Sequence, residues 1–291
     1  MRIKFYLQCI FLCVPFLTDG QTLSESADDL IKRGKWKEAC IFLERIKFDS
    51  SSPEIRNLAA FKKAYCYKQL KEFQEAQKEM ESINYVGLND SLSFKYRYES
   101  ALCAYLSGNF KDAESHIIQI NNFISDSINK RSTLFLEILI FNELRQWERA
   151  AQKIGELISA CSSPETRDSL IYAATKMYQK RSVPKLKKQP VAKVLSFIPG
   201  LGQVYAGYFL EGTSSFLLNL TFLTFGAYQI YEGFYFTGYF IGAGGLSKTF
   251  FGNMDRAEYL VEKHNYLKSR EFNDKVSEFL FKNIKYPFDL K

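Results

Sequence analysis

The sequence predicts an all-α protein in which a helical-hairpin solenoid is followed by a transmembrane helical hairpin. Three observations predict this fold class. Residues 22–161 repeat with a period of 37, residues 212–231 contain no charged residue, and the stretch 191–252 is almost free of charge although charged residues make up 24% of the chain. Periods of this length are typical of stacked helical repeats. Twenty uncharged residues form about 30 Å of helix, which matches the hydrocarbon thickness of a bilayer.

Residues 1–20 have the pattern of a secretory signal peptide. Arg2 and Lys4 precede an apolar run from Phe5 to Leu17, and small residues precede a cut after Gly20. The apolar run forms only about 20 Å of helix, so we prefer a cleaved signal to the alternative, an uncleaved anchor. Export places the remaining cysteines in an oxidising compartment. They match no zinc pattern, and we expect small buried side chains, with a disulfide between Cys66 and Cys103 left open.

Residues 22–181 contain four 37-residue repeats and a closing helix at 165–181. Each repeat has an aromatic residue, an alanine three positions later and apolar residues seven and ten positions later. These offsets lie on one face of a helix, because a helical turn has 3.6 residues. A small or apolar residue nine positions earlier, in a preceding helix, lets the two backbones pack. Neither helix buries its face alone, so we expect neighbouring hairpins to stack.

This repeat resembles the tetratricopeptide repeat family in the second helix of each hairpin. The residues that carry the resemblance are Trp36, Ala39, Phe73, Ala76, Phe110, Ala113, Trp147 and Ala150. The first helices lack the family's usual Trp-x-x-Leu-Gly run, and the period is longer than its 34 residues. The resemblance implies a groove that binds a protein or peptide partner. A spacer that only separates the membrane part from the rest is the alternative.

Residues 182–193 form a basic linker. Seven cations and no acid lie between Lys176 and Lys193, and Pro184 and Pro190 prevent one continuous helix. The position beside an apolar block favours membrane lipid over nucleic acid, and we expect no nucleic acid partner. The residues expected to contact lipid head groups are Lys185, Lys187, Lys188 and Lys193. A solvated linker is the alternative.

Residues 194–252 are expected to form the membrane hairpin. Glu232 and Gly233 separate its two helices, and Gly238 and Gly242 in the second helix form a packing face for the first. Asn219 and Thr221 are expected to hydrogen-bond across the hairpin, and four tyrosines suit an interfacial belt: Tyr228, Tyr231, Tyr235 and Tyr239. A buried soluble hairpin is the alternative. Whether 194–210 spans the membrane or lies at its interface stays open.

A glycine-rich motif precedes the hairpin and consists of Pro199, Gly200, Gly202, Gln203, Tyr205 and Gly207. It lacks the Lys-Ser/Thr of a phosphate-binding loop, so we interpret it as a membrane turn whose polar side chains satisfy backbone groups. Together with two apolar helices and the later Gly252 and Asn253, the motif resembles a family of bacterial envelope proteins with a two-helix membrane domain. The resemblance implies a location but no activity. Met254-Asp255-Arg256 departs from the apolar stretch expected at that point.

The remaining residues, 253–291, are expected to form an amphipathic helical tail on the surface or the solenoid, with Phe272, Val276, Phe279 and Leu280 at helical spacing. The pattern of ionisable residues indicates no catalytic, cofactor-binding or metal site, so we expect no enzyme and no cofactor. The cleaved signal places the repeats on the periplasmic side of the inner membrane, although the basic linker then opposes the positive-inside tendency.

The sequence therefore predicts a membrane-anchored scaffold of the bacterial cell envelope whose solenoid binds a protein or peptide. An oligomeric membrane channel or transport accessory protein with a regulatory repeat domain is the alternative. In either case the hairpin offers a surface for association of several copies of the chain.

Overall fold

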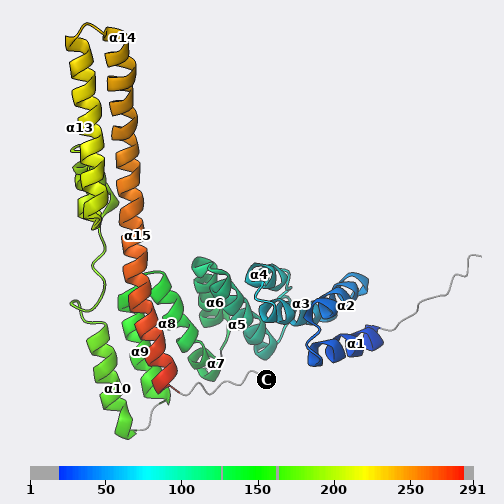
Figure 1. Cartoon of the computed structure of the whole chain (residues 1–291). Helices are drawn as coiled ribbons and strands as arrows, with labels where there is room; N and C mark the ends of the chain where they lie inside the picture. The colour runs from blue at the N-terminus through cyan, green and yellow to red at the C-terminus, as the bar shows by residue number, and fades with distance from the viewer. Residues whose placement is uncertain (1–19, 126, 162–163, 285–291) are drawn as a thin grey trace, which may run out of the picture. The chain divides into compact units, whose positions relative to one another are not determined.

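The computed structural model describes residues 20–125, 127–161 and 164–284. All regular elements in these ranges are helices and none is a strand, so the protein is all-α (Figure 1). The chain divides into two compact units, unit 1 up to Thr133 and unit 2 from Leu134 onward. The boundary falls just before the fourth repeat. Residues 1–19, which carry nearly all of the predicted signal peptide, lie outside the described ranges.

Unit 1 consists of three helical hairpins and a short final helix. The hairpins are α1/α2 (Gly20–Lys32 and Trp36–Asp49), α3/α4 (Pro53–Gln69 and Phe73–Glu81) and α5/α6 (Asp90–Ser107 and Phe110–Phe123), and α7 follows (Ser127–Ser132). Successive hairpins touch, because α2 packs on α3 and α4 packs on α5. The breaks between hairpins fall at the predicted Ser/Pro and Gly/Asn segments, where Pro53 and Asn89 begin or cap the next helix.

The 37-residue period coincides with the helical hairpins. In all four repeats the aromatic residue is the first residue of the second helix, including Trp147 at the start of α9 in unit 2. The small residue three positions later is fully buried in each case, and so is the residue nine positions before the aromatic one. The first set comprises Ala39, Ala76, Ala113 and Ala150, and the second comprises Ala27, Ala64, Ala101 and Ile138. The seven alanines among these residues let the two helices of a hairpin approach closely, and Ile138 is the one larger side chain.

One turn geometry connects the helices of every repeat. The residue two positions before the aromatic one has a positive φ: Gly34, Lys71, Gly108 and Arg145. The residue after it donates its backbone N–H to the carbonyl five positions earlier, a helix-ending motif that requires the left-handed conformation. The same turn occurs at Gly207 and Gly233 in unit 2. Lys71 and Arg145 adopt this conformation without the freedom of glycine, at a cost of about 1–2 kcal/mol.

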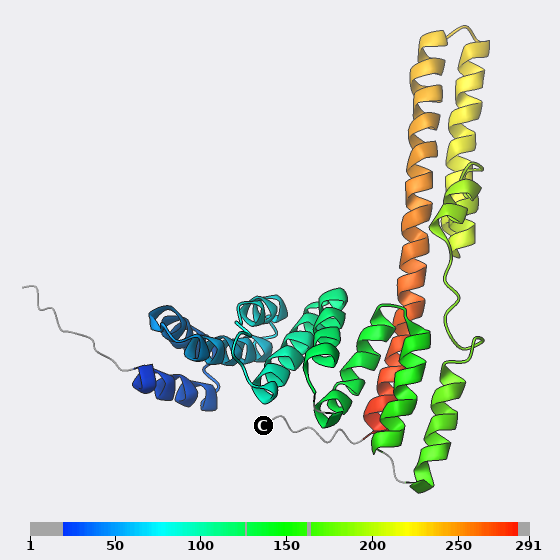
Figure 2. The same ribbon diagram turned by 180° about the vertical axis from the view of Figure 1, so that it is seen from behind.

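Unit 2 begins with the fourth hairpin and continues into an apolar helical hairpin (Figure 2). Its helices are α8 (Leu134–Glu143), α9 (Trp147–Cys161), α10 (Pro164–Met177), α11 (Gln189–Leu195), α12 (Leu201–Ala206), α13 (Phe209–Tyr231), α14 (Tyr235–Thr237), the π-helix η1 (Gly238–Ala243) and α15 (Gly244–Asn283). Both views show α13 running beside η1 and the first part of α15. The predicted break at Glu232-Gly233 is the turn of this hairpin.

Helix α15 changes the expected organisation of the carboxyl-terminal region. The predicted separate tail is a direct continuation of the second hairpin helix, in one helix of 40 residues. Its carboxyl-terminal half packs on α8, with Phe272, Val276 and Leu280 buried. The predicted closing helix, 165–181, corresponds to α10, which ends at Met177, packs on α9 and buries Ala174. The fourth hairpin is therefore covered by two elements, α10 and the end of α15.

The expectation of two membrane-spanning helices is not met. Within residues 20–284, leaving aside 126 and 162–163, no helix is both long and apolar enough to cross a membrane. Helix α13 has 23 residues, but Glu211, Asn219 and Gln229 lie among its apolar residues. The second half of the hairpin is shared by α14, η1 and the start of α15.

Candidate functional site: the glycine-lined hairpin and its base

The glycine-rich motif forms the base of the hairpin, between α11 and α13. Gly200, with a φ of 91°, is the N-cap of α12, and Gly207, with a φ of 98°, is its C-cap. Gly202 faces both α11 and α15, because a Cβ placed on it would lie 2.6 Å from the Ala192 carbonyl oxygen and 2.7 Å from the Ala257 Cβ. Any side chain at 202 would push these helices apart. Pro199 lies in the turn that precedes α12.

A buried polar contact joins the two sequence motifs that were predicted separately. The Gln203 amide donates hydrogen bonds to the side-chain and backbone carbonyl oxygens of Asn253, 50 residues later. Ser215 of α13 donates to the same Asn253 Oδ1 over 2.5 Å. Gln203 and Asn253 are almost completely buried. We expected Gln203 to satisfy a backbone group freed by the turn, whereas its main partner is the side chain of Asn253 within α15.

The polar contacts continue along the interior of the hairpin. Asn219 donates to the backbone carbonyl of Ser215 over 2.8 Å and accepts from the Thr249 hydroxyl over 2.9 Å. Asn219 therefore bonds across the hairpin as predicted, whereas Thr221 donates to Leu217 in its own helix. Asn219 and Thr249 thus exchange water contacts for protein contacts, whereas the Gln203 Oε1 and the Asn253 Nδ2 are buried with no hydrogen-bond partner in the described part of the chain.

Further from the base, the two helices of the hairpin contact each other through glycines, which lets their backbones come close together. Gly226 of α13 lies against Gly242 of η1, such that a Cβ on Gly226 would come within 3.0 Å of the Gly242 Cα. A Cβ on Gly238 would lie 2.7 Å from the Ile230 side chain. The structure therefore places both predicted packing glycines, Gly238 and Gly242, in the contact between the helices. Their partner Gly226 was not predicted, although its distance from Gly212, two helical heptads, is visible in the sequence.

The outer surface of the hairpin is apolar. Large side chains along α13, α14 and η1 are exposed, including Leu210 at 80% and Phe236 at 77% of their full area. Others are Phe209, Leu217, Leu218, Leu223, Tyr228, Tyr231, Phe234, Tyr235, Tyr239, Phe240 and Ile241. Of the four tyrosines predicted to form a belt, Tyr228, Tyr231 and Tyr235 lie within five residues of the turn at Gly233. The hairpin has small and polar residues inside and large apolar residues outside, the reverse of a water-soluble helix pair.

The basic linker is fixed to the base by its backbone rather than left free. The Asn265 side chain accepts from the Lys187 N–H and donates to the Lys187 carbonyl, both over 2.9 Å. The Tyr205 hydroxyl accepts from the Lys188 N–H over 3.1 Å. Lys193 pairs with Glu258 at 3.1 Å, so the structure does not leave it unpaired for a lipid head group. Lys185 and Lys188 have exposed side chains.

Lys187 and His264 lie close together at the end of α12, where a Cβ on Gly207 would lie 3.3 Å from the Lys187 Nζ and 3.6 Å from the His264 Nδ1. Burial, followed by the charges of Lys187 and Lys268, lowers the pKa of His264. Burial lowers the pKa of Lys187 as well. This corner of the base is therefore a positively charged environment in which additional protons are unfavourable.

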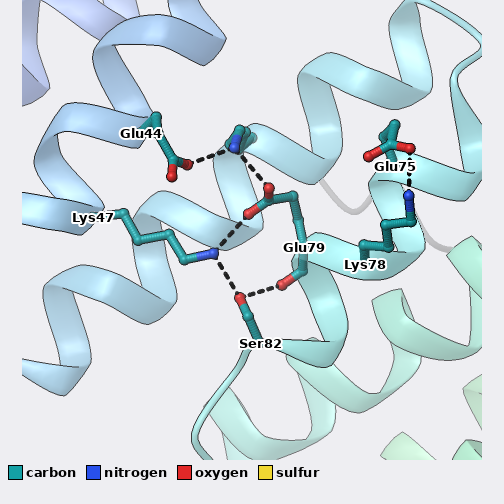
Figure 3. Close-up of polar contacts among 7 residues, drawn as sticks. Glu44, Lys47, Glu75, Lys78, Glu79 and Ser82 are labelled. Atoms are coloured by element: carbon teal, nitrogen blue, oxygen red, sulfur yellow. Dashed lines mark hydrogen bonds and ion pairs between the residues drawn. The ribbon is translucent and has the colours of Figure 1, made fainter.

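In unit 1 a charge network connects the first two repeats (Figure 3). Lys63 of α3 bridges Glu44 of α2 and Glu79 of α4, at 2.6 and 2.7 Å, and Lys47 binds Glu79 at 2.9 Å. Lys63 and Glu79 expose only 10% and 14% of their side chains. Burial alone would lower the pKa of Lys63, but its hydrogen bonds to Glu44 and Glu79 raise the pKa above its usual value. The network holds the stack together and offers no free reacting group.

The described cysteines are small core residues. Cys40, Cys66 and Cys103 are free and buried. Cys66 packs with Cys40 in the core between α2 and α3, whereas Cys103 belongs to the next core. Cys66 and Cys103 are therefore not bonded to each other here, which favours the expectation of buried thiols over the disulfide. Burial raises the pKa of Cys103 to about 12, so it is not a reactive thiolate.

Sequence reasoning missed several residues of this site: Ser215, Gly226, Thr249 and Asn265. Their signal was present as small or polar residues inside an apolar segment, which usually face another helix. In the described residues no group of His, Cys, Asp and Glu is arranged to hold a metal ion.

No family model matches the chain, and neither the curated proteins nor the solved structures include one that is detectably similar to it. The two resemblances noted above therefore rest on their sequence motifs, and the function must be argued from the geometry of the chain itself.

Proposed function

We propose that this chain is a membrane-anchored scaffold of the bacterial cell envelope. In this proposal the apolar hairpin inserts into the inner membrane, and the repeats stack as a solenoid on the periplasmic side and bind a protein or peptide partner. The observation that carries the proposal is the reversed polarity of the hairpin, with glycines and hydrogen-bonded polar groups inside and large apolar side chains outside.

Exposed apolar area on this scale needs a covering surface. Removing one large apolar side chain from water gains about 1.5–3 kcal/mol, and the outer surface of the hairpin carries more than ten such side chains. Contiguous patches of this size mark interaction surfaces rather than ordinary solvent-exposed surface. Lipid acyl chains fit the patch because it surrounds the hairpin instead of occupying one face.

The interior of the hairpin suits a lipid environment as well. Backbone groups are satisfied within the helices, as lipid requires, and the side chains of Asn219 and Thr249 bond each other. Lys188 of the basic linker has an exposed side chain and binds Tyr205 at the base of the hairpin through its backbone N–H, so an anionic head group there would contribute about 1 kcal/mol.

The partner-binding role rests on the surface of the repeats. Large apolar residues are exposed at the end of α2 (Phe48), in the turn after α4 (Val86) and at the end of α6 (Phe123). Val86 and Phe123 are one 37-residue period apart in the sequence. Equivalent exposed apolar positions are what a repeat array presents to an extended partner.

Flotation with phospholipid vesicles tests the anchoring role. The full chain is expected to float with vesicles of mixed neutral and anionic lipid. Leu217→Glu combined with Phe240→Glu should abolish flotation, because both side chains point outward and both charges would enter lipid at a cost of about 2–3 kcal/mol each. The matched control is Phe48→Glu with Phe123→Glu, exposed apolar residues of unit 1, which should float normally. A wild-type chain that stays in the vesicle-free fraction would contradict the proposal.

The scaffold role is tested separately by crosslinking in intact cells. A protein crosslinked through the repeats, and lost when Phe48, Val86 and Phe123 are all changed to Ser, is the expected result. If crosslinking captures no protein while the chain still floats with vesicles, the partner-binding role fails and the anchor remains.

A further inference from the structure

A cationic cavity lies at the turn of the fourth repeat, entirely within unit 2. It is formed by the α8–α9 turn, the first turns of α9 and the segment 178–185, and its volume is about 1140 Å³. Four cations line it and only one acid does: Arg145, Arg149, Lys180 and Lys185 against Glu148. Neither the membrane hairpin nor the charge network of unit 1 contributes to this cavity.

The floor of the cavity is aromatic and held in place. Trp147 and Tyr178 line it, and both rings pack edge-on against Phe272 of α15, with centroids 5.9 and 5.5 Å away. The Tyr178 hydroxyl donates to the Asn142 side chain over 3.0 Å. Arg145, at the rim, is held by Glu262 of α15 at 2.8 Å. Side chains locked in this way form a site that is already organised for a ligand.

One buried donor in this floor has no acceptor. The Trp147 Nε1 is buried, and nothing in the described part of the chain accepts its hydrogen bond. A buried indole N–H normally finds a partner, because leaving it unpaired costs about 1–3 kcal/mol. The Trp147 Nε1 is covered by protein atoms, so it is the four cations of the lining that favour an anionic, oxygen-rich ligand.

The size of the cavity decides what kind of anionic ligand fits. Pockets for small molecules usually measure about 300–1,000 Å³, and this one is larger and open to the surface. Its lining alternates charged side chains with Trp147, Tyr178 and Pro184, which suits the backbone and side chains of a peptide better than a single inorganic anion or an acyl chain.

We propose that this cavity binds an acidic segment of the partner protein, with its carboxylates on the cations of the rim and its backbone against the two aromatic rings. The inference rests on the partner-binding half of the proposed function and names the chemistry of the partner. It does not depend on insertion of the hairpin into lipid.

The test uses the full chain in mild detergent and a labelled peptide of alternating Glu and Gly, with a Gln and Gly peptide as the neutral probe. Trp36→Phe leaves Trp147 as the only tryptophan of the chain, so its fluorescence reports occupation of the cavity. The acidic peptide is expected to change this fluorescence and to bind more weakly as salt is added. Lys180→Glu with Lys185→Glu should weaken it by about tenfold or more.

The matched control changes two exposed lysines of unit 1, Lys37→Glu and Lys111→Glu, each one residue after a repeat aromatic. The inference is overturned if the neutral peptide binds as tightly as the acidic one. It is also overturned if the acidic peptide binds the cavity variant as tightly as the unchanged chain, or if the control variant loses as much affinity for it as the cavity variant. Vesicles of anionic lipid that bind through Lys180 and Lys185 when the peptide does not would overturn it as well. Failure of the acidic peptide alone, with crosslinked partners still captured by the repeats, removes this inference and leaves the scaffold role intact.

Discussion

Two glycines of the same helical chain are expected to respond oppositely to the same substitution. Gly242 lies against Gly226 in the hairpin, and a methyl carbon there would overlap the Gly226 Cα. Gly252, ten residues later, has no atom near the position of its missing Cβ. Alanine therefore forces the helices apart at 242 and meets only open space at 252.

The magnitudes follow from two opposing effects. In either helix alanine gains up to about 1 kcal/mol over glycine from backbone entropy. At Gly242 the added methyl also overpacks a close contact, at a cost of about 1–3 kcal/mol, because carbon atoms prefer separations of 3.5–4.0 Å. The free energy of opening the hairpin should thus be about 1–3 kcal/mol lower in Gly242→Ala than in Gly252→Ala.

Hydrogen exchange of backbone amides, measured peptide by peptide, reports this free energy locally. Peptides from 213–245 should exchange about 5- to 150-fold faster in Gly242→Ala than in Gly252→Ala, since 1.4 kcal/mol is a factor of ten. Exchange in unit 1 should be the same in both variants. If the hairpin peptides of Gly242→Ala exchange as slowly as those of Gly252→Ala, the close glycine contact is not what holds the hairpin together.

Three further outcomes are expected from unit 1. Lys63→Ala should lower the free energy of unfolding by more than about 1 kcal/mol in urea titrations, because it leaves the buried Glu79 carboxylate with Lys47 as its one remaining cation. Lys78→Ala, which removes an exposed ion pair, should have a smaller effect, and equal effects would refute the assigned burial. Lys71→Gly should raise the free energy of unfolding and Gly108→Ala should lower it, by about 1 kcal/mol each in urea titrations, because only glycine adopts a positive φ without strain. No change in either variant would contradict this assignment. Burial, then the charge of Arg97, lowers the pKa of His116, so the unfolded state binds more protons and stability should fall as pH drops below about 6.5. In His116→Gln the free energy of unfolding, measured from pH 7 to pH 5, should fall less steeply as the pH drops. An unchanged slope would show that another group causes the loss of stability.

The repeats could be predicted because their signal is local and redundant. An alanine follows the aromatic residue by three positions in every repeat, at 39, 76, 113 and 150. It is buried each time, because two helices approach closely there. The turn that joins these helices was harder to see. Gly34 and Gly108 mark it by composition, but Lys71 and Arg145 adopt the same positive φ because the surrounding helices impose it.

The base of the hairpin was predicted in pieces. Gln203 and Asn253 were each singled out, but the hydrogen bond between them joins residues 50 apart, and no local pattern encodes such a contact. The length of α15 was also missed. Charged residues after Met254 suggested a new segment, although no helix-breaking residue follows Gly252 before Asn283, so nothing in the sequence ends the helix.

Helix α15 carries one more implication. Its first turns belong to the glycine-lined hairpin, and about 40 Å further along the same rod Phe272 supports Trp147 and Tyr178. An uninterrupted helix transmits tilt much as a lever does. In the proposed membrane-bound state, a change in bilayer thickness or tension would tilt α15 and shift Trp147 and Tyr178 at its other end, with no hinge between them.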